Sequence, residues 1–366
     1  MNERNALIVG ASGIVGRAAF EHFANQDEWS VFGVSRRAPD LSVGTHVPLD
    51  LLDAEACRRS LGDLPAMSHL VYAALQEKPG LIEGWFDPET METNRCMLEN
   101  LLEAAEASGA VEHVSLLQGT KAYGAHVGRM RVPGREREAR HAHDNFYWLQ
   151  EDLLRERSAA GGYGFTIWRP PVIYGHAFGA PMNPIAPLVT FAAIAKHEGT
   201  PLCWPGGRTG PVDAMDARLL ARALEWSATA PTARNEVFNI SNGDVFVWEN
   251  VWSTIAETLG MEVGEPAPCR LAEVMPEKAD VWSEIVEKHG LRSPGLMEFV
   301  GDSFVYADLH LGVGRAHPAP PNMMSTIKLR QAGFHDCIDS EDMLVEWIEW
   351  MQRERLIPAA KIVPLH

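Results

Sequence analysis

The sequence lacks the features that would mark a secreted, membrane-spanning or metal-binding protein. Its 366 residues include only five cysteines, which are scattered, form no Cys-x-x-Cys pair and have no histidine at metal-ligand spacing. No apolar run is long enough to span a bilayer, and the opening MNERNALIVG has no signal-peptide pattern. Internal repeats are absent too. These absences predict a cytoplasmic protein with no metal site and no membrane partner.

Positive charge is also scarce. Lys and Arg number 32 against 49 Asp and Glu, which gives a formal net charge of -17. The electrostatic field of so much negative charge repels phosphate backbones and anionic lipid, which argues against nucleic acid as a partner. A hydrophobic content of 46% lets the chain bury a large core, in one large domain or two intermediate ones.

The first forty residues follow the order strand, glycine turn, helix. An apolar run over residues 6–9 leads into Gly-Ala-Ser-Gly-Ile-Val-Gly, and the Ala-rich residues 17–25 have a helical pattern. Glycines allow the sharp turn, the approach of a pyrophosphate to the backbone, and close packing of the helix, whose N-terminus then faces the phosphates. We therefore predict a dinucleotide site that includes Gly10, Ser12, Gly13, Ile14, Val15 and Gly16.

Two arginines follow a second predicted strand over residues 30–35. An NAD-selective fold usually has an acidic residue here, on the ribose hydroxyls, whereas Arg36 and Arg37 favour a 2′-phosphate and hence NADPH. Ser35 is expected to contact the same cofactor. The alternative is that the two arginines only form a solvated turn.

Strands and helices continue to alternate along the chain. Strands are predicted over residues 47–53, 69–74, 111–117, 165–167 and 237–243, with Asp50 and Leu51 near the adenine and Ala73 along the path of the cofactor. Asp53 and Asp216 are predicted helix N-caps. This alternation predicts an α/β fold with a Rossmann-type doubly wound parallel sheet.

Two later segments hold candidate functional groups. One reads Leu-Leu-Gln-Gly-Thr-Lys121-Ala-Tyr-Gly at a strand end, and the other reads Asn-Phe-Tyr147-Trp-Leu-Gln-Glu-Asp on a helix. They resemble extended short-chain dehydrogenases, except that Gly119 stands near the usual Ser and Glu151 replaces the Lys of Tyr-x-x-x-Lys. The altered combination resembles the progesterone 5β-reductase and iridoid synthase-like enone reductases, nearly end to end. Further matching segments are residues 33–37, 168–170, 172–175, 192–199 and 239–248.

This resemblance implies an NADPH-dependent 1,4-reduction of the C=C bond of an enone. Tyr147 would bind the carbonyl oxygen as negative charge develops there, Lys121 would give electrostatic support, solvent would protonate the α-carbon, and no metal is needed. Pro170 and Val172 would line the cofactor. The family commonly has two adjacent tyrosines in the helix motif, whereas here Trp148 follows Tyr147.

The predicted organisation is an NADPH-binding domain over residues 1–175, with a returning segment at about 210–243. Residues 176–209 and 244–366 would form a smaller, mostly helical substrate-binding region. Candidate substrate contacts are Tyr123, Phe178 and Met182. The basic stretch after Gly124 is predicted to be a mobile surface loop with solvated His141 and His143, and a homodimer is expected.

Two other functions stay open. A sugar-nucleotide epimerase or dehydratase shares the fold but requires Tyr-x-x-x-Lys, which is missing. A regulator that senses NADP(H) would do no chemistry, although the presence of both Lys121 and Tyr147 argues against it. The small-molecule partner could be a steroid, a monoterpenoid or a small cyclic enone.

Overall fold

A computed structural model of the chain describes residues 4–78 and 82–360. The chain forms two compact units. The first takes the residues up to Ile173 together with Met215–Ser241 and Asn322–Cys337, and the second takes Tyr174–Ala214, Asn242–Pro321 and the residues from Ile338 onward.

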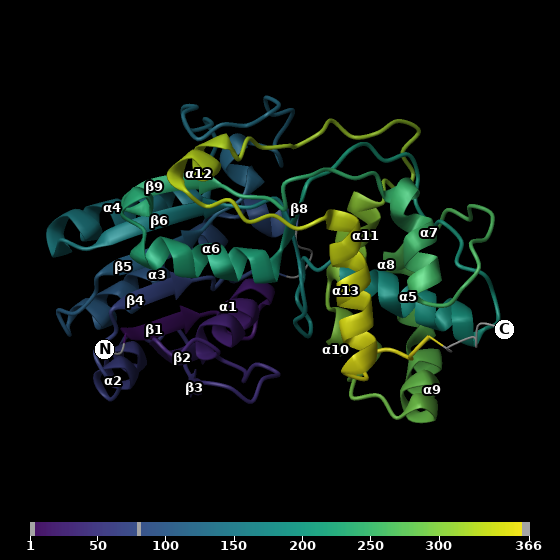
Figure 1. The fold of residues 1–366 in the computed structure, drawn as a ribbon, viewed down its shortest axis with the longest axis horizontal. Coiled ribbons are helices and arrows are strands. Elements are labelled where there is room, and N and C mark those ends of the chain that lie inside the picture. The colour runs from purple at the N-terminus through teal and green to yellow at the C-terminus, as the bar shows by residue number, and fades with distance from the viewer. Residues whose placement is uncertain (1–3, 79–81, 361–366) are drawn as a thin grey trace. The chain divides into compact units, whose positions relative to one another are not determined.

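The first unit is built on a parallel sheet of seven strands in the order β3-β2-β1-β4-β5-β6-β9 (Figure 1). The strands are β1 (Arg4–Val9), β2 (Trp29–Ser35), β3 (Thr45–Pro48), β4 (His69–Tyr72), β5 (His113–Leu117), β6 (Gly164–Arg169) and β9 (Glu236–Asn239). The order reverses between β1 and β4, and in open α/β sheets ligands bind beyond the carboxyl ends of the strands at such a reversal. The predicted fold class is confirmed.

Helices cover both faces of this sheet. On one face α1 (Ile14–Ala24) packs against α6 (Ala217–Thr229), while α3 (Pro88–Glu106) contacts both α2 (Ala54–Gly62) and α4 (Phe146–Gly161) on the other. The N-cap predictions are confirmed, since Asp53 accepts a hydrogen bond from the Ala56 amide and Asp216 accepts one from the Arg218 amide.

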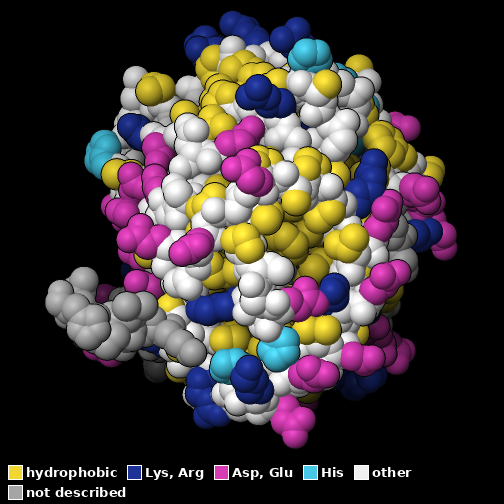
Figure 2. All heavy atoms as spheres, turned by 90° about the vertical axis from the view of Figure 1, so that its right-hand side faces the viewer, with side chains coloured by type: hydrophobic (Ala, Val, Ile, Leu, Met, Phe, Trp, Pro, Cys, Tyr) yellow, Lys and Arg dark blue, Asp and Glu magenta, His cyan; other side chains and the backbone are white. Residues whose placement is uncertain are grey.

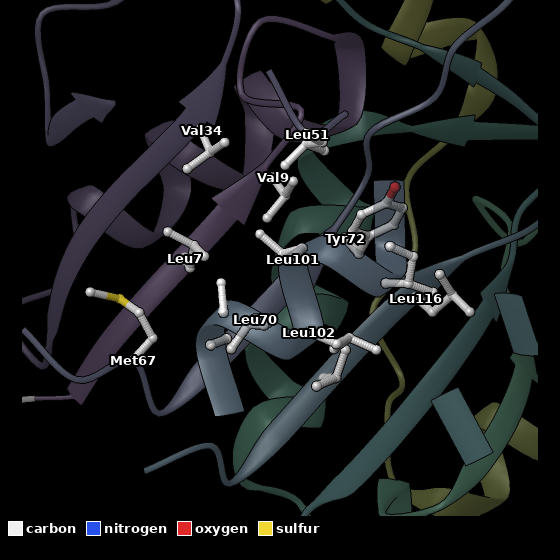
Figure 3. Close-up of a cluster of buried hydrophobic side chains, with 14 of the residues drawn as sticks. Leu7, Val9, Val34, Leu51, Met67, Leu70, Tyr72, Leu101, Leu102 and Leu116 are labelled. Atoms are coloured by element: carbon white, nitrogen blue, oxygen red, sulfur yellow. The ribbon is translucent and has the colours of Figure 1, made fainter. Parts of the chain in front are cut away.

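The core of the first unit lies between the central strands and α3. Leu7 and Val9 of β1, Leu70 and Tyr72 of β4, and Leu101 of α3 meet in one buried cluster (Figure 3). Leu7 and Val9 alternate along β1 with Ala6 and Ile8, which are fully buried as well. A parallel strand buried on both faces has a continuous apolar run, which is why the sequence pattern located these strands.

The third strand is shorter than predicted. It ends at Pro48, and Asp50 lies beyond it, where its Oδ1 accepts a hydrogen bond from the Leu52 amide at 3.0 Å. This side-chain contact stabilises a turn of the backbone, which competes with strand continuation through residues 50–53.

The segment Asn322–Cys337 belongs to the first unit, which differs from its predicted place in the substrate-binding region. Its helix α12 (Ile327–Ala332) lies along the edge strand β9, and Lys328 donates a hydrogen bond to the Val237 carbonyl at 2.9 Å. The ring of Phe334 packs 5.6 Å from that of Trp226 on α6. These tertiary contacts place the segment beside the sheet, and no local sequence pattern indicates this position.

The second unit is helical. Its helices are α5 (Ile185–His197), α7 (Trp248–Thr258), α8 (Leu271–Val274), α9 (Ala279–His289), α10 (Leu296–Val300), α11 (Ser303–His310) and α13 (Ser340–Arg353). Trp347 of α13 is buried in the core of this unit. Figure 2 shows a face on which apolar side chains gather among acidic and basic groups.

Two short strands, β7 (Val172–Tyr174) and β8 (Ala214–Asp216), pair in a separate small sheet. None of the helices in the described part of the chain is both long and apolar enough to cross a membrane. Within the same residues, no group of three or more His, Cys, Asp and Glu side chains is arranged to hold a metal ion.

Candidate active site

The glycine turn between β1 and α1 is tightly constrained. Gly10 has a φ of 88°, and a Cβ there would lie 2.8 Å from the backbone of Ala73 and Ala74. A Cβ on Gly16 would lie 2.0 Å from the Gly10 carbonyl oxygen. The fold itself therefore requires glycine at both positions.

Gly13 differs from the other two glycines. A Cβ built there would lie 3.4 Å from its nearest neighbour, the Gly10 carbonyl oxygen, so the fold leaves room for a side chain. Gly13 is the N-cap of α1, and among the described residues no side chain caps this helix. The open glycine and uncapped N-terminus fit a bound pyrophosphate. Ser12, Ile14 and Val15 in the same turn are partly exposed.

The carboxyl end of β2 presents the two arginines to solvent. Arg36 and Arg37 are exposed, while Ser35 is buried and donates a hydrogen bond to the Arg37 carbonyl at 2.6 Å. His46 on β3 lies 3.1 Å from the Ser35 hydroxyl. The turn that carries both arginines is thus held by the strand end and by β3.

The other predicted cofactor residues lie at the same edge of the sheet or just beyond it. Ala73 follows β4 and donates its amide to the Val9 carbonyl at 2.9 Å. Asp50 is exposed beyond β3, whereas Leu51 is buried and its carbonyl accepts a hydrogen bond from Asn100. Pro170 follows β6, and Val172 begins β7.

The hydroxyl of Tyr147 lies at the carboxyl edge of the sheet. A Cβ on Gly119, two residues beyond β5, would lie 3.3 Å from the Tyr147 Oη and 3.3 Å from the Pro170 carbonyl oxygen. A side chain at position 119 would therefore crowd the hydroxyl, and glycine lets the hydroxyl lie close to the backbone at the end of β5. Tyr147 is partly exposed. Its hydroxyl is in a position to meet a ligand at the ends of β5 and β6.

The Asn145 side chain joins the two motifs. Its Oδ1 accepts the Tyr147 amide at 3.0 Å as the N-cap of α4, and its Nδ2 donates to the Lys121 carbonyl at 3.3 Å. One residue thus fixes the start of the tyrosine-bearing helix to the lysine-bearing segment η2 (Thr120–Tyr123).

Glu151, which stands where short-chain dehydrogenases have their lysine, is buried and lies at the centre of an ionic network. It accepts hydrogen bonds from Gln118 at 3.0 Å and from Arg155 at 2.9 Å, and it pairs with Arg169 at 3.5 Å and Arg140 at 3.2 Å. Burial alone would raise the pKa of Glu151, but Gln118 and the arginines outweigh it, and the pKa lies below its usual range. Glu151 is therefore a structural anion and does not take over the function of the lysine.

The Lys121 ammonium points away from this network. Its Nζ lies 3.8 Å from the centre of the Trp85 ring and 3.9 Å from Oε1 of Glu77. Burial lowers the pKa of Lys121 to about 8, against the opposing effect of the Glu77 carboxylate. Lys121 therefore responds to pH in a range where most lysines stay charged.

The candidate substrate residues occupy different surroundings. Tyr123 is buried, and its hydroxyl donates to Asn239 at 2.6 Å and accepts from Arg169 at 3.4 Å, which favours a packing role. Phe178 and Met182 belong to the second unit and are partly exposed. The Phe178 ring contacts His176 and Phe299 there.

The basic segment after Gly124 is more firmly anchored than a free surface loop. Its Glu136 accepts a hydrogen bond from the Asn239 amide at 2.8 Å, and Arg140 pairs with Asp152 at 2.6 Å. His141 is exposed, but the ring of His143 packs against Trp148 and His126. These contacts join residues far apart in the sequence, so composition alone could not predict them.

Sequence reasoning missed three residues around the site. Asn145 begins the motif that carries Tyr147, and its position before a predicted helix is the signal for its capping function. Gln118 lies in the segment that carries Lys121, but its contact with Glu151 depends on the tertiary fold. No sequence pattern could identify Glu77, because a single acidic residue in a polar stretch is common.

The fold and the glycine turn define a dinucleotide-binding α/β protein of the doubly wound type. The chain belongs to the NAD dependent epimerase/dehydratase family, whose model matches residues 6–241. The (S)-8-oxocitronellyl enol synthase of Nepeta racemosa is 33% identical over 97% of this chain and 94% of its own. The 3-oxo-Delta(4,5)-steroid 5-beta-reductase of Arabidopsis thaliana is 32% identical over the same shares, 97% and 94%. These relatives confirm the predicted resemblance.

Solved structures support the fold alone. A UDP-glucose 4-epimerase from Thermotoga maritima, solved with UDP-glucose, matches with a TM-score of 0.66 and 16% identity, over 95% of this chain and 99% of its own. The UDP-glucose 4-epimerase of Thermus thermophilus in complex with NAD gives a TM-score of 0.63 and 18% identity, over 94% and 99%.

Proposed function

We propose that the protein is an NADPH-dependent reductase that adds hydride to the β-carbon of an α,β-unsaturated carbonyl compound. The observation that carries this proposal is the Tyr147 hydroxyl beside Gly119, at the edge of the sheet where doubly wound folds bind their ligands. The names of the relatives, an enol synthase and a 3-oxo-steroid 5β-reductase, point to the same substrate class.

The residues at the sheet edge fit NADPH. The open Gly13 and the uncapped N-terminus of α1 would hold the pyrophosphate, and exposed Arg36 and Arg37 would hold the 2′-phosphate. When bound, the cofactor supplies the hydride that reduces the C=C bond.

The chain's own residues would stabilise the charge that this addition creates. Hydride adds to the β-carbon, the C=C electron pair moves toward the carbonyl, and negative charge develops on the oxygen. Tyr147 donates a hydrogen bond to that oxygen, and the Lys121 ammonium lowers the energy of the anion through space. Solvent then protonates the α-carbon, which balances the reduction with no metal.

Glu151 argues against the epimerase alternative. Epimerases of this fold need a lysine four residues after the tyrosine, and this position holds a carboxylate paired with Arg140, Arg155 and Arg169. An acidic group so paired keeps its charge and cannot provide a cation next to the tyrosine.

The test is NADPH oxidation against a panel of steroid, monoterpenoid and small cyclic enones. We expect turnover with at least one class, and a product saturated at the C=C bond with the carbonyl intact. NADPH binding without turnover on any enone would contradict the proposal and favour the sensor. Epimerisation of a UDP-sugar would favour the alternative enzyme.

Cofactor preference tests the arginine pair separately. The double substitution Arg36→Ser and Arg37→Ser should raise the KM for NADPH roughly tenfold or more while the KM for NADH changes little, because only NADPH carries the 2′-phosphate. The matched control is Arg58→Ser, an exposed arginine on α2 that pairs with Glu103. An equal rise in the KM for NADPH and for NADH would show that the two arginines do not bind the 2′-phosphate.

A further inference from the structure

The Lys121 ammonium lies between the side chains of Glu77 and Trp85. Its side chain is 13% exposed and that of Glu77 is 9% exposed, with 3.9 Å between Nζ and Oε1. Trp85, in the short helix η1 (Glu83–Phe86), places the face of its indole 3.8 Å from Nζ. An anion and an aromatic face thus flank one nearly buried ammonium.

Lys121 and Glu77 form an ion pair without a hydrogen bond between them. A separation of 3.9 Å is too long for a hydrogen bond, and Oε1 of Glu77 accepts no hydrogen bond from any residue that the structure describes. Such a buried carboxylate costs folding free energy that an apolar side chain would not. Burial raises the pKa of Glu77, against the opposing effects of the Lys121 charge and of the Trp85 side chain.

The other charged groups near Lys121 do not replace Glu77. Lys78 next to it is paired with Asp87 at 2.7 Å and Glu89 at 3.0 Å. His126 contacts the Trp85 ring, and burial is the main cause that lowers its pKa to about 4. The neighbouring His143 also has its pKa lowered, chiefly by burial. Both imidazoles are neutral at pH 7, so Glu77 is the anion that faces the ammonium.

We propose that Glu77 and Trp85 are positioning residues that keep Lys121 charged at the sheet edge and thereby set the upper pH limit of the reduction. The inference rests on the proposed function, because it takes Lys121 as the electrostatic support of the reacting carbonyl. The carboxylate favours the charged lysine through its field, and the indole attracts the ammonium through its quadrupole.

The test is the pH profile of kcat/KM in Glu77→Gln. Without the anion the Lys121 pKa falls below its present value of about 8. The alkaline limb of the profile should therefore move to lower pH by about one unit, since a nearby opposite charge shifts a pKa by that order. Glu77→Asp keeps the negative charge, so its alkaline limb should lie close to that of the wild type. Trp85→Leu should move the alkaline limb to lower pH, as Glu77→Gln does. Trp85→Phe, which keeps an aromatic face, should lie near the wild type.

Glu89→Gln is the matched control, because it removes one acidic charge from the neighbouring helix at a side chain that is 82% exposed. Its pH profile should equal that of the wild type. If Glu77→Gln folds poorly, Trp85→Leu still tests the inference, because it removes the aromatic face that contacts the ammonium and keeps the carboxylate. An alkaline limb that stays in place in Glu77→Gln, or in Trp85→Leu where the glutamine variant does not fold, overturns the inference.

A second readout separates this inference from the proposed function. Competitive labelling of amines at several pH values, read by peptide mass spectrometry, follows the Lys121 titration without any turnover. A lower labelling midpoint in Glu77→Gln, in a protein that reduces no enone, would support the control of Lys121 by Glu77 while the reductase proposal fails. An unchanged midpoint overturns the inference, whatever the protein reduces.

Discussion

Replacing Tyr147 by phenylalanine should lower kcat for enone reduction by about 10²- to 10³-fold, the usual cost of removing one donor that stabilises a developing oxyanion. The ring would stay in place, because Phe146 packs against it with 4.6 Å between ring centroids and Asn145 caps the helix through the backbone amide. NADPH affinity should change little. Steady-state kinetics with a saturating enone, together with a cofactor titration, would measure both quantities.

The neighbouring Trp148 provides the matched control. Its indole lies under the Arg140 guanidinium, with 5.0 Å between the guanidinium carbon and the ring centroid, and does not flank Gly119 as the Tyr147 hydroxyl does. Trp148→Phe should therefore keep kcat within a few-fold of the wild type. Full activity in Tyr147→Phe would contradict its assignment as the oxyanion donor.

Gly16→Ala should destabilise the protein by about 3 kcal/mol, the upper range for forcing extra atoms into a packed site. The added Cβ would lie 2.0 Å from the Gly10 carbonyl oxygen and 2.5 Å from its carbonyl carbon. Both atoms are backbone, and Gly10 is itself held against Ala73 and Ala74, so the turn cannot yield without moving α1 or β4. Thermal unfolding followed by circular dichroism would detect the loss.

Gly13→Ala in the same turn separates stability from binding. Its Cβ would meet nothing nearer than 3.4 Å, so the unfolding temperature should stay close to that of the wild type. NADPH binding should nevertheless weaken, because the methyl group would project toward the proposed pyrophosphate site. Equal stability losses in the two variants would mean that the turn is not packed as described.

The sequence could predict what depends on local pattern. The runs of β1, β2 and β4 are apolar because both faces of a parallel sheet are buried, and the glycine turn has a spacing set by its own geometry. Asp53 and Asp216 are caps because a side-chain oxygen next to a helix start can satisfy an amide.

What could not be predicted depends on contacts between distant residues or on competing local bonds. The helix α12 has only six residues, and its place is set by β9 rather than by its own sequence. Asp50 ended the third strand early through a bond to the Leu52 amide. The environment of Lys121 arises from Glu77 and Trp85, which no motif links to it.

Neither compact unit of the protein is an uninterrupted stretch of polypeptide. The chain passes from one unit to the other five times, after Ile173, Ala214, Ser241, Pro321 and Cys337. A truncation at Pro321 would therefore remove α12 from the sheet-bearing unit and α13 from the helical unit at once. No single cut releases either unit whole, so expression of one continuous fragment cannot isolate the sheet-bearing unit. A mutation that unfolds one unit can affect the other through all five connections.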